Sequence, residues 1–144
     1  MAVGDYQDML KLSSRKNKIL IDTNVIVYMY EQKKDVFDFA LKIITDAEFF
    51  ILDKSIKELE KVYREKPRKL EQIKKFIDKL LLINQVKILE TPKEILEKID
   101  KVDKILIYFS KEYLIYTNDR KLKQKILEKN RRVLTLRLHD VYLN

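Results

Sequence analysis

The sequence predicts an α/β protein, a three-layer α/β/α sandwich with a central, mostly parallel sheet. Short runs of β-branched residues alternate with longer segments of helical periodicity, a pattern typical of parallel strands covered by helices on both faces. The chain has 144 residues, 46% of them apolar and 38% charged, which suffices for one core and argues against a disordered tail. We therefore expect one domain, without a linker, an internal repeat or a low-complexity tract.

The expected elements follow in chain order. The β-branched runs predict strands at 19–22, 48–53, 86–90, 113–117 and 133–136. The apolar spacing predicts helices at 23–32, 35–45, 54–65, 68–84, 92–111 and 118–129. The helix from 92 begins with an N-cap threonine, a proline and a nearby acid, in the order Thr91-Pro92-Lys93-Glu94. Residues 1–17 are expected to form a short N-terminal extension and residues 18–144 the folded domain.

Composition excludes several classes of chemistry. The chain has no Cys, one Gly (Gly4) and one His (His139). Without Cys there is no disulfide framework, thiol nucleophile or Cys-based zinc site. One glycine cannot build a Walker loop or a dinucleotide-binding GxGxxG motif. A Ser–His–Asp triad would need His139, in a segment that looks poorly anchored, so carboxylates, lysines and hydroxyls remain the main groups available for catalysis.

The sequence shows no targeting signal or membrane span. Its longest uninterrupted apolar run, at 25–30, is far short of the about 20 residues that a spanning helix needs. We therefore expect a soluble, cytoplasmic protein with no membrane partner.

Basic residues are concentrated in two stretches. The net charge is +8, and residues 120–144 hold eight basic residues against two acids, while residues 54–79 hold ten against five. Clustered Lys and Arg indicate a polyanion partner, because neutralising phosphates releases counterions. Lys-rich helices are also commonly plain solvated faces, and for 54–79 both interpretations stay open. In the stretch at 120–144, the candidates for binding a nucleic acid are Arg120, Lys121, Lys123, Lys125, Arg131 and Arg132. The exposed tyrosine that could stack on a base is Tyr142.

Acidic and amide side chains follow two of the expected strands directly. Asp22 and Asn24 come after the first strand, and Asn118 and Asp119 follow Thr117 at the end of the fourth. In an open parallel sheet, ligands bind at the carboxyl ends of the strands, near the topological switch point. Each Asp can equally cap the helix that follows it, which stabilises that helix by about 1 kcal/mol. Capping and catalysis are compatible, and the pair at matched positions favours a site.

Two further acids are expected near the same edge. Glu58 follows the second strand by about one helical turn, so its carboxylate can point back over the sheet. Asp103 is expected on the inward side of its helix, where an Asp needs a partner or a metal. Asp100, one turn earlier, is expected to be solvated.

Several carboxylates at one place need a cation. Ligands that are all oxygen select hard ions, Mg²⁺ or Mn²⁺. Such an ion activates a water and stabilises the leaving oxygen of an in-line phosphodiester attack, and two ions about 4 Å apart would share these tasks. Thr117 and Asn118 can hold a water or a phosphate oxygen, while the surrounding Lys and Arg hold the polyanion.

Four motifs, in order, resemble a PIN-domain nuclease. They are IDTNV at 21–25, IKEL at 56–59, VDKIL at 102–106 and YTND at 116–119, the last followed by the basic segment RKLKQKI. The resemblance covers about residues 19–138 and implies a parallel α/β fold and a metal-dependent endoribonuclease. Carried over by position, the site acids and the supporting polar residues are Asp22, Glu58, Asp103, Asp119, Asn24 and Thr117. The segment at 111–117 departs from the family because it is short and lacks the usual Gly, and this leaves the third acid open between Asp103 and Asp100.

The resemblance also implies partners. Many relatives are VapC-type toxins with an antitoxin that inserts into the site, and others are archaeal relatives of nucleases that process ribosomal RNA. Dimers are common among them. The expected partners are therefore RNA, an antitoxin or a ribosome-assembly factor, and a second copy of the chain, although no self-complementary surface is evident in the sequence.

Three alternatives remain. A haloacid-dehalogenase-type phosphatase needs a second acid two residues after Asp22, where this chain has Asn24. A receiver-like phosphoacceptor needs paired acids at the first strand, and one is present. A PIN-like domain that binds RNA or a protein without cutting is the alternative outside the enzymes, and the intact set of acids argues against it.

Overall fold

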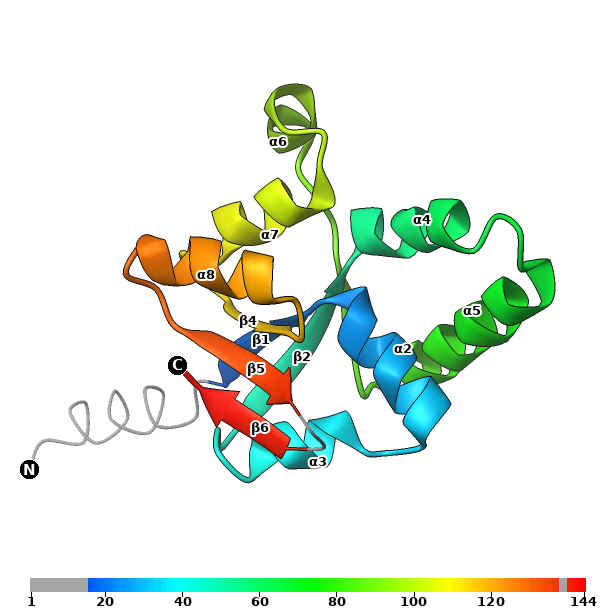
Figure 1. Cartoon of the computed structure of the whole chain (residues 1–144), viewed down its shortest axis with the longest axis horizontal. Helices are drawn as coiled ribbons and strands as arrows, with labels where there is room; N and C mark the ends of the chain where they lie inside the picture. The colour runs from blue at the N-terminus through cyan, green and yellow to red at the C-terminus, as the bar shows by residue number, and fades with distance from the viewer. Residues whose placement is uncertain (1–15, 138–139) are drawn as a thin grey trace, which may run out of the picture.

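The structure is a computed structural model that describes residues 16–137 and 140–144. A six-stranded sheet with the order β3-β2-β1-β4-β5-β6 lies at its centre (Figure 1). Neighbouring strands are parallel except β5 and β6, which are antiparallel. The strands are β1 (Asn17–Ile21), β2 (Ala47–Leu52), β3 (Lys87–Leu89), β4 (Leu114–Thr117), β5 (Val133–Arg137) and β6 (Asp140–Leu143). Residues 1–15 of the expected N-terminal extension and His139 lie outside the described residues.

The helices cover both faces of this sheet. They are α2 (Thr23–Gln32), α3 (Val36–Leu41), α4 (Asp53–Val62), α5 (Pro67–Leu82), α6 (Lys93–Lys98), α7 (Val102–Phe109) and α8 (Arg120–Glu128). One core forms between one sheet face and α2 to α5, and includes Ile19, Ile21 and Ile73. The other forms between the opposite face and α7 and α8, and includes Leu20 and Leu122. Because successive strand residues point to opposite faces, the buried run of β1 supplies both cores, and the three-layer α/β sandwich is confirmed.

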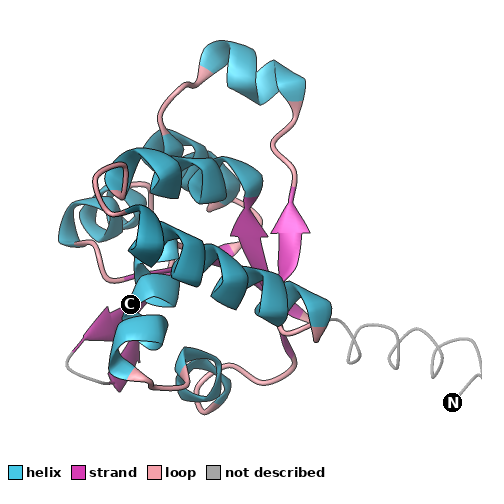
Figure 2. Ribbon diagram, turned by 90° about the vertical axis from the view of Figure 1, so that its right-hand side faces the viewer, coloured by secondary structure: helices cyan, strands magenta, loops and turns pink. Residues whose placement is uncertain are grey.

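The helix expected at 92–111 is wrong as a single element. The chain leaves the helical conformation at Ile99, whose φ and ψ are −130° and 118°, so α6 and α7 are separate. A continuous helix of that length would span about 28 Å, well beyond the short strands that it would have to cover. No residue of α6 is buried, and α6 projects from the fold (Figures 1 and 2), with Ile95 packed against the edge of the smaller core. The break returns the chain to the edge of the sheet, where α7 begins.

The strand β6 has no counterpart among the expected elements. Its residues alternate, with Val141 buried and Tyr142 exposed, which is the pattern of a strand with one face covered. The segment is anchored by pairing with β5, and by the side chain of Asn144, whose Nδ2 donates to Thr135 Oγ1 over 3.1 Å.

The switch point of the sheet lies between β1 and β4. From β1 the chain builds outward through β2 to β3, and then crosses over to β4 and β5 on the other side of β1. The carboxyl ends of β1 and β4 therefore lie side by side, with one following helix on each face. None of the helices in the described ranges is long and apolar enough to cross a membrane.

Candidate active site

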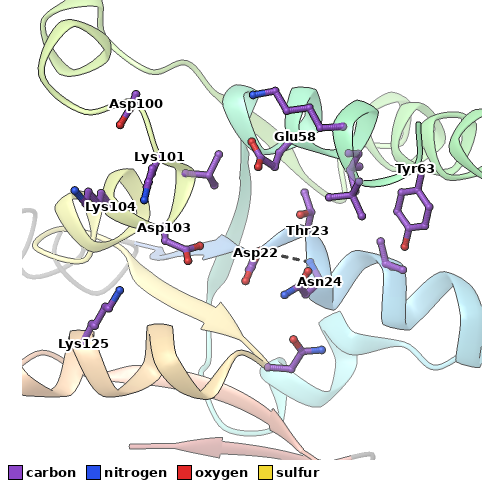
Figure 3. A pocket seen from close by; sticks show the side chains of 16 residues that line it. Asp22, Thr23, Asn24, Glu58, Tyr63, Asp100, Lys101, Asp103, Lys104 and Lys125 are labelled. Carbon is purple, nitrogen blue, oxygen red and sulfur yellow. Dashed lines mark hydrogen bonds between the residues drawn. The ribbon is translucent and has the colours of Figure 1, made fainter. Parts of the chain in front are cut away.

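A cleft of about 700 Å³ opens at the switch point. Its lining comes from the start of α2, one side of α4, the start of α7, and the segment from β4 into α8 (Figure 3). The acids and amides that line it are Asp22, Asn24, Glu58, Asp100, Asp103 and Asn118. The sheet topology thus brings together most of the side chains that the strand-end argument selected.

Asp22 is the buried acid of the cleft. It is 7% exposed and is the N-cap of α2, with its Oδ1 accepting from Asn24 N–H at a long 3.5 Å. Its Oδ2 accepts the hydroxyl of Thr117 at 2.8 Å. Burial, together with the charges of Asp103 and Asp119, raises the pKa of Asp22 to about 6, against the effect of these hydrogen bonds. Among the described residues, no Lys or Arg forms an ion pair with this carboxyl group.

Thr117 joins the two strand-end acids. Its side chain is fully buried and accepts from Asp119 N–H at 3.0 Å while it donates to Asp22. Both hydrogen bonds of the Thr117 hydroxyl thus join parts of the protein, and Thr117 does not line the cleft. A contact between Thr117 and a bound water or a phosphate oxygen stays a prediction.

Asp119 is the N-cap of α8. Its Oδ1 accepts from the N–H groups of Lys121 and Leu122, at 2.9 and 3.3 Å. Asp119 is half-buried and does not line the cleft, but its charge raises the pKa of both Asp22 and Asp103. Asp22 and Asp119 are thus caps of neighbouring helices and, at the same time, members of one electrostatic cluster.

The remaining acids come from α4 and α7. Glu58 is exposed in the cleft, while Leu59 beside it is buried in the core. Asp103 is exposed rather than inward, because Ile105 and Leu106 take the buried positions of α7. Partial burial of its carboxyl group and the charges of Asp119 and Glu58 raise the pKa of Asp103, while Lys125 lowers it.

Asp103 and Asp100 differ in direction. In Figure 3, Asp103 points toward Asp22, whereas Asp100 lies at the far rim, before α7 begins. The charge of Asp103 also acts on Asp22. Of the two acids that the sequence left open, Asp103 is the one that the structure couples to the buried carboxylate.

The donor set suits a hard cation, although the acids are spread out. All the available ligands are oxygens, and the charge of Asp119 raises the pKa of both Asp22 and Asp103. In the described part of the chain, no three acidic or His side chains lie close enough to hold one metal ion together. Mg²⁺ keeps several waters and commonly uses one or two carboxylates, so this spacing fits such an ion better than a fully protein-bound one.

Lysines surround the acids. Lys61, Lys101, Lys104 and Lys125 line the cleft, and they come from α4, from the segment before α7, and from α7 and α8. No ion pair within the described ranges joins them to the cleft acids. Of the other predicted RNA ligands, Arg120, Lys121 and Arg132 are exposed and Lys123 is half-buried.

Arg131 has a structural role that the sequence did not indicate. Its Nη1 donates to the backbone carbonyl of Ile107 and to Ser110 Oγ, both at 3.0 Å. A cation at a helix C-terminus stabilises the last carbonyl groups. Arg131 therefore holds the end of α7, the helix that carries Asp103, through Nη1, and RNA binding by Arg131 stays a prediction.

Two cleft features were missed in the sequence. Tyr63, at the end of α4, and Lys61 both line the cleft. Their signal was the basic stretch at 54–79, for which a solvated face and a binding face were both open. Asp53 also follows a strand, but it does not line the cleft. Its Oδ1 accepts from Thr91 N–H and from the Thr91 hydroxyl, at 3.2 and 2.7 Å, so its role is structural.

The fold and cleft define an α/β protein with an acidic site in a basic frame at the switch point of its sheet. The PIN domain family model matches residues 19–136. A solved structure, described as that of the PIN domain endonuclease Utp24, is similar to this chain, with a sequence identity of 25% and a TM-score of 0.59. The match covers 88% of this chain and 90% of the chain in that structure. No curated protein matches. The chain belongs to the PIN domain family, and these similarities place it with nucleases.

Proposed function

We propose that this protein is an endoribonuclease that hydrolyses RNA phosphodiester bonds with Mg²⁺ or Mn²⁺ bound in the cleft. The observation that carries the proposal is the group of carboxylates at one sheet edge, where the negative charge of Asp119 raises the pKa of both Asp22 and Asp103. Such repulsion is costly for folding, and a bound cation offsets that cost. The similarity to an endonuclease supports cutting rather than binding alone.

The residues divide the work in the proposed enzyme. Asp22, Glu58, Asp103 and Asp119 hold the cation, directly or through its waters, and Thr117 keeps the carboxylate of Asp22 in place. The bound ion supplies an activated water and neutralises charge that develops on the phosphate. Asn24 and Asn118 line the cleft and can donate to phosphate oxygens. The lysines of the rim offset the repulsion between RNA and the acids.

Cleavage of defined RNAs tests this proposal. The full chain is incubated with end-labelled structured and single-stranded RNAs in Mn²⁺, in Mg²⁺ or in EDTA. Internal cuts that need a divalent ion are expected. Binding without cutting in every condition would instead support a non-catalytic RNA-binding domain. Processing of ribosomal or transfer RNA and toxin-type cleavage are the two proposed roles, with a ribosome-assembly factor or an antitoxin as the respective partner, and the RNA that is cut separates them.

The lysines of α8 provide a separate prediction. Lys125 lines the cleft and Lys121 is exposed one turn earlier on the same helix. Replacing both by Gln is expected to weaken RNA binding and to reduce the slope of log K against log salt by about 1.4, since each single-strand phosphate contact contributes about 0.7. Filter binding between low and moderate salt measures that slope. The control replaces Lys33 and Lys34, exposed beyond the opposite end of α2; equal slopes in the two variants would place the RNA elsewhere.

A further inference from the structure

Tyr63 is the aromatic side chain of the cleft. Of the described residues that line the cleft, it is the only aromatic one. It ends α4, so it lies beyond Glu58 along the same wall, and Figure 3 shows it on the side of Asp22 away from Asp103. An aromatic ring beside a phosphodiester site is placed to meet the base of a neighbouring nucleotide.

The ring of Tyr63 is supported from within the protein. Lys69 Nζ lies 5.4 Å from the ring centroid, in a cation–π contact, and the same ammonium is paired with Glu31. The ring is half-buried and packs at the edge of the larger core. Within the described residues its hydroxyl has no hydrogen-bond partner, so packing and Lys69 hold the side chain. A ring held in this way has little side-chain entropy to lose when a base stacks on it.

A second hollow continues from the cleft at this residue. It has a volume of about 520 Å³ and is lined by residues 61–66, so it shares Lys61, Val62 and Tyr63 with the cleft. The turn from α4 to α5 that forms it is basic, with five Lys or Arg and one acid in residues 61–69. The cleft with the acids and the hollow with the exposed cations therefore share Tyr63 in their linings, and we call the two together the trough.

We propose that Tyr63 is a stacking platform for an unpaired RNA base next to the cleavage site, and that the basic turn at 61–66 holds the phosphates of the strand beyond it. This inference rests on the proposed function and adds the class of substrate, a single-stranded segment. An aromatic ring takes the face of any base, and Lys and Arg follow the backbone. A paired base keeps its faces within the helix stack and cannot use the platform.

Tyr142 is the alternative that the sequence favoured. It is 49% exposed on β6, an edge strand, and it does not line the cleft. The two tyrosines therefore form a matched pair, one inside the trough and one outside it.

Fluorescence titration of 2-aminopurine-labelled RNA tests the proposal. The full chain carrying Asp22→Asn, which keeps the RNA uncut, is compared with the same chain carrying in addition Tyr63→Leu, Tyr63→Phe or Tyr142→Leu. Tyr63→Leu is expected to weaken single-strand binding about tenfold or more and to abolish quenching of the base. Tyr63→Phe and Tyr142→Leu are expected to bind the RNA and quench its base as the chain with Asp22→Asn alone does. Duplex RNA is expected to bind the Asp22→Asn chain and its three double variants equally.

The outcomes separate this inference from the proposed function. Unchanged binding and quenching in Tyr63→Leu, at an unchanged melting temperature, would overturn the stacking platform while RNA binding stands. Equal losses in Tyr63→Phe and Tyr63→Leu would also overturn it, because the hydroxyl and not the ring would then carry the contact. A parent chain that binds no RNA would overturn the proposed function, and the platform with it.

Discussion

Asp22→Asn is expected to lower RNA cleavage by about a thousandfold or more, the order of effect that follows loss of a group that stabilises the transition state. Asparagine still caps a helix and still accepts the hydroxyl of Thr117, so α2 and the link to β4 remain. It removes the negative charge that we place beside the cation. Single-turnover cleavage of one end-labelled RNA, in excess enzyme with Mn²⁺, measures the loss.

The same substitution is expected to stabilise the metal-free protein. Because the pKa of Asp22 is raised to about 6 in the folded chain from an ordinary 3.8, the folded state binds this proton more tightly than the unfolded state. Above pH 6 the ionised carboxylate therefore costs stability, roughly 3 kcal/mol. In EDTA at pH 7, the melting temperature of Asp22→Asn should be higher than that of wild type. The difference between the two melting temperatures should decrease as the pH falls toward 4.

Asp35→Asn is the matched control for both measurements. Asp35 is also a helix N-cap, with its Oδ1 accepting from Phe37 N–H and Asp38 N–H at 3.1 Å, but it lies outside the cleft. Its variant should cleave RNA like wild type, with little change in melting temperature. Full cleavage by Asp22→Asn would show that Asp22 is a cap and nothing more.

Millimolar Mg²⁺ or Mn²⁺ is expected to raise the melting temperature of wild type by roughly 5–10 °C. An ion at a hundred times its Kd stabilises the folded state by about 2.7 kcal/mol, and each kcal/mol moves a domain of this size by about 2–4 °C. In Asp103→Asn, most of this rise in melting temperature should be lost, because the carboxylate of Asp103 interacts electrostatically with Asp22 and Asp119. Asp100→Asn, at the rim of the cleft, should show the same rise as wild type.

Thermal melts with added Mn²⁺, then with EDTA in excess, separate the two acids. Equal shifts in wild type and Asp103→Asn would remove Asp103 from the cation site. A larger loss in Asp100→Asn than in Asp103→Asn would reverse their assignment.

The parallel fold was open to prediction because the cues are local. Alternation between β-branched runs and helical periodicity located the five strands β1 to β5 and most helices, since both signals depend on neighbours in sequence. The break at Ile99 was missed because the apolar positions of the expected helix continue in register through Ile99. The length of that helix is limited by the size of the sheet, which is not a local feature of the sequence. The strand β6 was missed because its stabilising partner, β5, is a tertiary contact.

The sequence predicted an acidic site at the strand ends, but it did not identify which of the polar residues there line the cleft. Asp22, Asp53 and Asp119 all follow strands, and no local signal distinguishes the structural Asp53 from the other two. Its partner, Thr91, is 38 residues away. The buried role of Thr117 and the anchoring of α7 by Arg131 likewise depend on contacts across the fold.

The chemistry of the RNA ends made by the enzyme tests the central claim most directly. Attack by a water with departure of the 3′ oxygen leaves a 5′-phosphate and a 3′-hydroxyl, whereas attack by the RNA's own 2′-hydroxyl expels the 5′ oxygen and leaves a 2′,3′-cyclic phosphate and a 5′-hydroxyl. Products made in Mn²⁺ by wild type and by Asp119→Asn are compared by ligation and phosphatase treatment. We predict 5′-phosphate ends from wild type, absent in EDTA and from Asp119→Asn. Cyclic phosphate ends, or cuts that persist in EDTA and in the variant, would contradict a metal-dependent carboxylate site.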